Sequence, residues 1–389
     1  MTTHVFVVND RTFKYHLEYM FAGTCASSDV LFLENSNYTN SRKKDEGITA
    51  KQELTAAGMI ADISRIRAGD KILFYLTQQG NEHEGLFFGT FKAVGEPFYN
   101  TNSDNYLSEE LGVCLNFRIQ IEPDIVFSAG VSEHDALDSL ENISHPSQMC
   151  WSMIYRKLKG KRGCTMLTEY ESERLSELIK KNNQCHPLQG SFFTYDEANH
   201  CIIQSEQHNS YVGSKPLISI MNRLLYKARR NRKYEAYLQA YIMQNINNEP
   251  LKSLLMIDDK SSLWIGNEVS CGVGMQSIDV MTMQKAESTI KISIIELKCV
   301  EAYDSIIYWQ LPRYITWVSE YLAPLYGDHK VEIVPVILAK AFENDEYRKN
   351  YVSKCSAFKY ENRANCQISS IKFITYSLTN DGIRFTCES

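Results

Sequence analysis

Hydrophobic positions in the first 182 residues recur mostly in short runs of the length that is typical of β-strands. Runs of this kind lie at 4–8, 71–75, 86–91, 115–121 and 125–127. One longer stretch, 54–66, spaces its apolar residues at helical intervals instead. This succession of many strands and few helices predicts a small β-barrel with helices for residues 1–182.

Helical and extended patterns alternate over residues 216–389. Helical spacing is found at 216–225, 233–243 and 302–321. Extended apolar runs are found at 331–338, 371–376 and 383–386, the first of them apolar enough for a sheet that is covered on both faces. Because proline cannot continue a helix, Pro312 requires a kink or a restart there. We expect the polar segment 343–367 to be mobile.

Residues 183–215 differ in composition from the parts on either side. They are polar, and the runs 192–195 and 201–204 could pair as a hairpin about an Asp-Glu-Ala-Asn turn. His186, His200 and His208 have no ligand spacing to one another and are interpreted as solvated. We therefore predict a two-domain protein of α+β or α/β class, with domains at 1–182 and 216–389 and a connector between them.

The segment 268–298 is predicted to form two strands of a hairpin, which carry Asp279 on one strand and Glu296, Leu297 and Lys298 on the other. In a strand, side chains alternate between faces, so Glu296 and Lys298 share one face with the apolar Ile292 and Ile294. A buried charge must be paired, bound to a metal or neutralised by a pKa shift, and Asp279 can bring a second carboxylate to the same place. Two acids and a lysine suit a magnesium-dependent phosphodiesterase, although an E-x-K on a strand is also typical of an ordinary cross-strand ion pair.

The pattern G-x-x-x-I-D-V followed by I-I-E-L-K resembles the PD-(D/E)XK nuclease superfamily, most closely its NucS-like (EndoMS) and Mrr-like branches. The resemblance implies a restriction-endonuclease-like mixed sheet flanked by helices, and Mg²⁺ or Mn²⁺ as cofactor. It assigns metal binding to Asp279, Glu296 and the backbone carbonyl of Leu297, and catalysis to Lys298. Ile278 stands where the superfamily name implies proline, and the loop 284–289 between the acids is longer than usual.

Three further residues match positions outside the two predicted strands. The related nucleases carry a glutamate on a preceding helix, and the resemblance gives that role to Glu235. Their Q-x-x-x-Y motif matches Gln310 and Tyr314, which are one helical turn apart, and implies that the glutamine orients water or the scissile phosphate.

A second resemblance covers most of residues 1–182. The runs R-I-R-A-G-D-K-I-L-F-Y and G-L-F-F-G-T-F-K-A-V are similar to the EVE/YTH branch of PUA-like barrels, as is the strand that leads into a helix capped by Thr168 and Glu171. Such domains hold a modified base in an aromatic cage, which implies a nucleic-acid reader. The candidate cage and phosphate-contacting residues are Trp151, Tyr75, Phe88, Tyr99, Arg156, Lys157 and Lys161.

Composition and charge narrow the class of protein. The 389 residues carry a net charge of −6, which argues against a generic polyanion binder. Basic residues nevertheless cluster at 156–162 and again at 223–233, the latter including Arg229 and Arg230, as expected for localised phosphate contacts. The 11 cysteines show no paired spacing, so they indicate neither a zinc site nor a disulfide framework, and we expect a cytoplasmic protein without membrane contact.

These observations favour a DNA endonuclease that recognises a modified base, as in restriction of foreign DNA. One alternative is a repair endonuclease directed by mismatches or branched structures. Another is a nucleic-acid binding protein with an inactive nuclease fold. The substrate of any of these proteins could also be RNA. Because double-strand breaks need two active sites, we expect a homodimer.

Overall fold

The computed structural model describes residues 1–25, 50–78, 83–100, 106–138, 163–207, 209–271, 276–361, 365–380 and 382–389. The chain divides into two compact units, Met1–Ser219 (unit 1) and Ile220–Ser389 (unit 2). The segment 183–215 therefore belongs to unit 1. None of the helices in the described ranges has both the length and the apolar character needed to cross a membrane.

Unit 1 is built on a mixed sheet. Its strands are β1 (Thr3–Val8), β2 (Phe21–Thr24), β3 (Lys71–Leu76), β4 (Leu86–Tyr99), β5 (Phe117–Pro123), β6 (Val131–Ser132) and β7 (Cys164–Leu167). The order is β2-β5-β4-β3-β1-β7, with β6 beside β4 and β1 parallel to β3. Closure of this sheet into a barrel stays a prediction.

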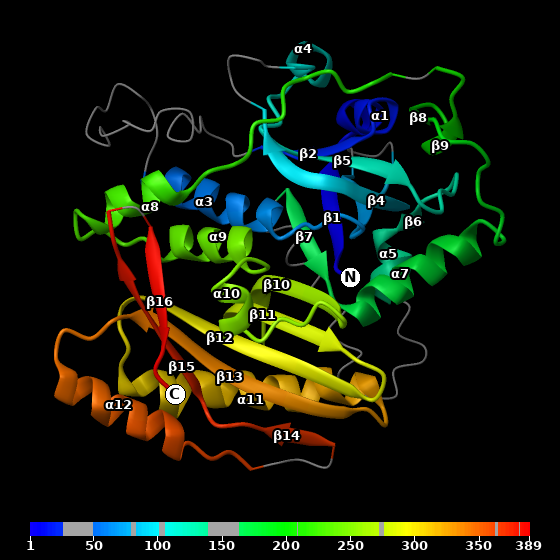
Figure 1. The fold of residues 1–389 in the computed structure, drawn as a ribbon. Coiled ribbons are helices and arrows are strands. Elements are labelled where there is room, and N and C mark those ends of the chain that lie inside the picture. The colour runs from blue at the N-terminus through cyan, green and yellow to red at the C-terminus, as the bar shows by residue number, and fades with distance from the viewer. Residues whose placement is uncertain are drawn as a thin grey trace. The chain divides into compact units, whose positions relative to one another are not determined.

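Helices and a separate hairpin complete unit 1 (Figure 1). The helices are α1 (Asp10–Glu18), α3 (Ala50–Ser64), α4 (Ser108–Leu111), α5 (Glu133–Asp138) and α7 (Glu169–Asn182). The predicted hairpin in 192–204 is confirmed as β8 (Phe193–Asp196) and β9 (Cys201–Gln204). The predicted cap is confirmed as well, because Thr168 accepts a hydrogen bond from the Glu171 amide while the Glu171 carboxylate accepts one from the Thr168 amide.

Unit 2 contains a second mixed sheet. Its strands are β10 (Ser262–Ser270), β11 (Ser277–Lys285), β12 (Thr289–Glu301), β13 (Lys330–Lys340), β14 (Cys366–Ile368), β15 (Lys372–Leu378) and β16 (Ile383–Cys387). The order is β10-β11-β12-β13-β15-β16, with β14 beside β13. Strand β13 runs parallel to β12 and β15, whereas β10, β11 and β12 are successive antiparallel neighbours.

The helices of unit 2 flank this sheet, and Figure 1 shows α9 on one side of it and α11 on the other. The α-helices are α8 (Met221–Ala228), α9 (Glu235–Asn245), α10 (Leu251–Leu254), α11 (Leu311–Trp317) and α12 (Asp345–Ala357), and α11 lies between π-helical turns at Ile306–Gln310 and Val318–Leu322, the second of which leads into a 3-10 turn at Ala323–Tyr326. Eight of the eleven residues of β13 are apolar, and all of these are buried, as expected for a strand covered on both faces.

Three local predictions for unit 2 meet different outcomes. The kink or restart at Pro312 is confirmed. A π-helical turn, Ile306–Gln310, ends just before α11, and Pro312 lies in the first turn of α11. The prediction of a long loop between the two acids is wrong, since only residues 286–288 separate β11 from β12. The segment 343–367, whose expected mobility stays a prediction, contains α12, which Asn344 caps and which buries only Tyr351 and Cys355.

Candidate active site

The two predicted acids lie side by side on neighbouring strands. Val280 of β11 pairs with Ile295 of β12 in antiparallel register, which places Asp279 opposite Glu296. Glu296 is only 2% exposed and Lys298 only 8% exposed, whereas Asp279 is half-buried. The structure thus brings together the three side chains that sequence analysis singled out.

Hydrogen bonds fix the relative positions of these groups. The Lys298 Nζ donates to Glu296 Oε1 at 2.5 Å and to the Leu297 carbonyl oxygen at 3.0 Å. The Leu297 amide donates to Asp279 Oδ2 at 2.7 Å. The Lys298 ammonium therefore binds the carbonyl oxygen of Leu297 that the resemblance assigned to a metal. Leu297 contacts both charged groups, Lys298 through its carbonyl oxygen and Asp279 through its amide.

Electrostatic interactions oppose ionisation of both acids. Burial raises the pKa of Asp279 well above its usual value, and the neighbouring Glu296 raises it further. Burial also raises the pKa of Glu296, although Lys298 opposes this shift. For Lys298, burial would lower the pKa, but the attraction of Glu296 and Asp279 outweighs it and the pKa is raised. The Lys298 ammonium therefore stays protonated at neutral pH, and it is the cation that stabilises the ionised forms of both Glu296 and Asp279.

One oxygen of Glu296 has no partner. Its Oε2 atom is buried and, among the described residues, no donor meets the geometry of a hydrogen bond to it, although the nearby Tyr314 hydroxyl lowers the pKa of this carboxyl. Leaving a buried carboxylate oxygen unsatisfied costs free energy, so such atoms usually have a bound ion or water. Carboxylate oxygens are also the ligands that Mg²⁺ prefers, so this donor set fits the predicted metal.

Helices on either side of the sheet contribute further groups. Glu235, the first residue of α9, accepts a hydrogen bond from the Cys299 amide at 3.4 Å, and its charge raises the pKa values of both Glu296 and Lys298. Tyr314 of α11 interacts with the Glu296 carboxylate, and burial together with that carboxylate raises the tyrosine pKa. Gln310 lies at the start of α11, and its Oε1 is buried with no hydrogen-bond partner in the described chain.

Sequence analysis missed a third carboxylate in this sheet. Asn267 of β10 pairs with Val280 and Val269 pairs with Ile278, so Glu268 lies opposite Asp279. The Glu268 backbone has a φ of 49°, which a residue with a side chain rarely adopts within a strand. Its carboxylate accepts hydrogen bonds from Gln239 Nε2 at 3.1 Å and from Ser277 Oγ at 2.7 Å.

Glu268 also acts on the predicted site, because its charge raises the pKa of Asp279. Gln239 links the two acids, since the same Nε2 that donates to Glu268 donates to the Asp279 carbonyl at 2.8 Å. The alternation of side chains along β10 gave no signal for Glu268, because the signal lies in the backbone conformation at that residue.

Basic residues of unit 2 line two adjoining hollows. The first, of about 570 Å³, is lined by Arg232, Lys233 and Lys340 and also by Tyr234 and Cys299. The second, of about 710 Å³, shares Lys340 with the first and adds Arg229. Cys299 directly follows Lys298 in β12, but Asp279, Glu296 and Lys298 do not line either hollow, and Glu301 and Glu343 contribute acidic groups to the lining of the first.

The basic cluster at 223–233 separates into exposed and buried members. Arg229 and Arg230 are exposed, and Arg230 lies over the Tyr226 ring at 4.5 Å from its centre. Arg223 and Lys227 are buried, so they are not part of a solvated basic face.

The predicted base cage of unit 1 is not assembled by the described residues. Tyr75, Phe88 and Tyr99 are all buried, and the Tyr75 hydroxyl donates a hydrogen bond to Glu133. These rings are core residues and present no free face to a base. The other candidates, Trp151, Arg156, Lys157 and Lys161, lie outside the described residues.

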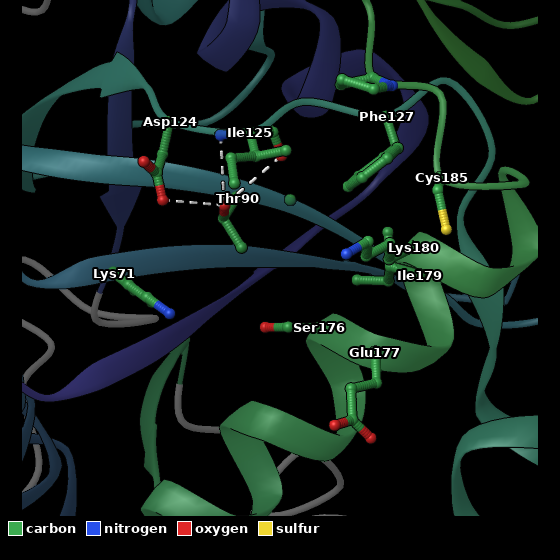
Figure 2. Close-up of a pocket in the computed structure, with 12 residues that line it drawn as sticks. Lys71, Thr90, Asp124, Ile125, Phe127, Ser176, Glu177, Ile179, Lys180 and Cys185 are labelled. Carbon is green, nitrogen blue, oxygen red and sulfur yellow. Dashed lines mark hydrogen bonds between the residues drawn. The ribbon is translucent and has the colours of Figure 1, made fainter.

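Unit 1 nevertheless contains a cavity of about 370 Å³, between β3, β4 and α7 (Figure 2). Charged side chains from its two sides, Lys71, Asp124, Glu177 and Lys180, line it together with apolar residues. Thr90 donates a hydrogen bond to Asp124 Oδ2 at 3.2 Å. Phe127 is its one aromatic lining residue, so the described walls do not form an aromatic cage.

Comparisons with known proteins leave the family of this chain open. No protein-family model and no curated protein matches it. A structure of a hypothetical protein from Leishmania major is similar with 9% identity, covering 47% of this chain and 96% of that one at a TM-score of 0.30. Human THYN1 protein in complex with DNA containing 5-methylcytosine is similar with 11% identity, 46% and 98% coverage and a TM-score of 0.26. At these TM-scores neither likeness decides the fold or the function.

Proposed function

We propose that unit 2 is a metal-dependent nuclease that hydrolyses phosphodiester bonds at Asp279, Glu296 and Lys298. The observation that carries this proposal is the buried Glu296 carboxylate, which keeps one oxygen unpartnered although a lysine, a tyrosine and a second acid surround it. An ion pair that served stability alone would satisfy both oxygens.

Asp279 and Glu296 would hold Mg²⁺ or Mn²⁺, with Glu235 and Glu268 as outer carboxylates that set the charge of the site. When bound, such an ion polarises a phosphate oxygen and lowers the pKa of a bound water. The Lys298 ammonium is held by Glu296 and by the Leu297 carbonyl, so its remaining donor capacity can stabilise negative charge that develops on the phosphate. The Leu297 amide keeps Asp279 in place.

The substrate is proposed to be a nucleic acid, with DNA preferred. The hollows lined by Arg229, Arg232, Lys233 and Lys340 support this, because a polyanion that occupied them would pass beside Cys299. The resemblance of residues 1–182 to EVE/YTH domains supports a finer proposal, that unit 1 reads a modified base and so directs cleavage.

Plasmid cleavage tests the reaction. The full chain, with Mg²⁺ or Mn²⁺ supplied, should convert supercoiled DNA to nicked or linear forms, and chelation should stop it. Asp279→Asn and Glu296→Gln should each lower the rate by at least about 100-fold, because either change removes a carboxylate ligand. Glu287→Gln, an exposed acid in the turn between β11 and β12, is the matched control and should cut at the wild-type rate.

The choice of substrates separates the alternatives. Cutting only of plasmids with methylated or hydroxymethylated bases supports a modification-dependent enzyme, whereas cutting only of mismatched or branched DNA supports a repair enzyme. Cutting that persists in Asp279→Asn would contradict the proposed site. If all forms of DNA and RNA are bound but not cut, the protein is a binding module with a nuclease-like arrangement.

A further inference from the structure

Three potential metal ligands from distant parts of the chain meet in unit 1. Asp10 is the first residue of α1, His83 precedes β4, and His200 lies in the turn between β8 and β9. One ligand atom from each of these side chains lies within 4.8 Å of the other two. In the described part of the chain, no other group of three or more His, Cys, Asp or Glu residues meets so closely.

The hydrogen bonds of His83 suggest that positive charge is needed between it and Asp10. Its Nδ1 lies 2.7 Å from the Glu84 carbonyl oxygen, which can only accept, so Nδ1 carries the hydrogen. In a neutral ring, Nε2 then directs its lone pair at Asp10 Oδ2, 3.2 Å away, which is also an acceptor. Two acceptors at this distance repel each other unless a cation or a second proton lies between them.

The separation of these two atoms suits a metal ion. Ligand bonds of about 2.0–2.1 Å in a tetrahedral zinc site place neighbouring ligand atoms about 3.3 Å apart. Neutral imidazole and carboxylate together favour zinc or a similar transition metal over Mg²⁺ and Ca²⁺, which prefer oxygen ligands. With His83 4%, Asp10 16% and His200 29% exposed, the group is enclosed yet open to an ion from solvent.

A buried tyrosine orients two of the three ligands. The Tyr195 hydroxyl donates to Asp10 Oδ1 at 2.9 Å and lies 3.1 Å from His200 Nδ1. Its ring packs on Phe13 of α1, with ring centres 5.0 Å apart, so the hydroxyl is held in place. Together with the Glu84 carbonyl on His83, this is the kind of outer hydrogen bonding that positions metal ligands.

We propose that Asp10, His83 and His200 bind a divalent transition-metal ion of the Zn²⁺ type and that this ion fastens the β8–β9 hairpin to α1. A two-stranded hairpin is marginally stable by itself. The hairpin already contacts α1 through Thr194, which donates to Glu18 at 2.7 Å, and the ion adds a cross-link among three separate segments. Three protein ligands leave a fourth position for water. The expectation that His200 is solvated is wrong, because its ring contacts Tyr195 and His83.

Cobalt binding tests this site separately from the proposed nuclease site. The host is the full chain with Asp279→Asn and Glu296→Gln, stripped of metal by chelation, so that unit 2 contributes little binding. We expect one Co²⁺ per chain with the intense visible absorption of tetrahedral coordination, displaced by Zn²⁺. Adding His83→Gln or His200→Gln should weaken Co²⁺ binding by at least about 100-fold. His134→Gln, an exposed histidine of α5, should bind as the host does.

Hydrogen exchange tests the proposed structural role of the bound ion. Zn²⁺ should slow hydrogen exchange of backbone amides in β8 and β9 in the host and not in His83→Gln, with circular dichroism confirming that the variant is folded. The proposal is overturned if the host takes up no Co²⁺, if the absorption is that of octahedral coordination, or if His83→Gln binds as tightly as the host. The last result would leave a protonated His83–Asp10 ion pair as the explanation of the short contact.

Discussion

Replacing Lys298 by methionine should expose the cost of burying Glu296. The change removes the 2.5 Å contact with Glu296 Oε1 and leaves a carboxylate that is 2% exposed without its countercharge. A buried charge that loses its partner costs about 3–5 kcal/mol, unless the group takes up a proton instead. The free energy of unfolding of unit 2 should therefore fall sharply.

Protonation sets a ceiling on this cost. The ordinary pKa of the Glu296 carboxyl is 4.5, and one pKa unit corresponds to about 1.36 kcal/mol. Holding the group neutral therefore costs at most about 4 kcal/mol at about pH 7.5, and about 1 kcal/mol at about pH 5. Since the pKa in the folded variant is raised above the unfolded value, the lost stability returns as pH falls toward the unfolded pKa.

The assay is urea-induced unfolding without metal, followed through the fluorescence of Trp264 and Trp317, which are both buried in unit 2. Lys298→Met is compared with the double variant Lys298→Met/Glu296→Gln, which keeps the shape but removes the charge. The double variant should be the more stable by about 3–4 kcal/mol at about pH 7.5, and the gap should shrink to about 1 kcal/mol at about pH 5. Equal stabilities at the higher pH would refute the reasoning, because the carboxylate would then carry no burial cost.

Two predictions concern unit 1. Burial lowers the pKa of His16 to about 4 from an ordinary 6.5, so the unfolded state takes up the proton first and stability falls as pH drops through this range. Between about pH 7.5 and pH 5, the free energy of unfolding of the wild type should fall by about 2 kcal/mol more than that of His16→Gln. The measurement is the urea dependence of amide exchange in β3. Equal falls in the two proteins would contradict this prediction. Thr168→Ala should lower the free energy of unfolding of unit 1 by about 1 kcal/mol in the same assay, because the first turn of α7 loses its cap.

Sequence reasoning succeeded where a local rule determined the outcome. Asp279 and Glu296 were placed together because side chains alternate along strands and a hairpin brings neighbouring strands into register. The Thr168 cap of α7 followed from residue types at a fixed spacing. The change of helix at Pro312 followed from the missing amide hydrogen of proline.

It failed where the outcome depended on tertiary contacts. Helix α12 buries only Tyr351 and Cys355, so its sequence shows almost no apolar period. Asp10, His83 and His200 come from three distant segments, and no spacing in the sequence records that these segments meet. Tyr75 was assigned to a base cage for its aromatic character, yet the sheet places its ring in the core.

The row of acids across β10, β11 and β12 is the strongest reason to regard this sheet as a functional site. Glu268 lies opposite Asp279, and Asp279 lies opposite Glu296, so three acidic residues occupy adjoining positions on neighbouring strands while Lys298 supplies a single ammonium. Like charges on directly opposite residues destabilise a sheet, and the backbone of Glu268 adds strain. Features that break local rules tend to gather where function requires them. A divalent cation would offset the excess negative charge, and the open oxygen of Glu296 is where it would be needed.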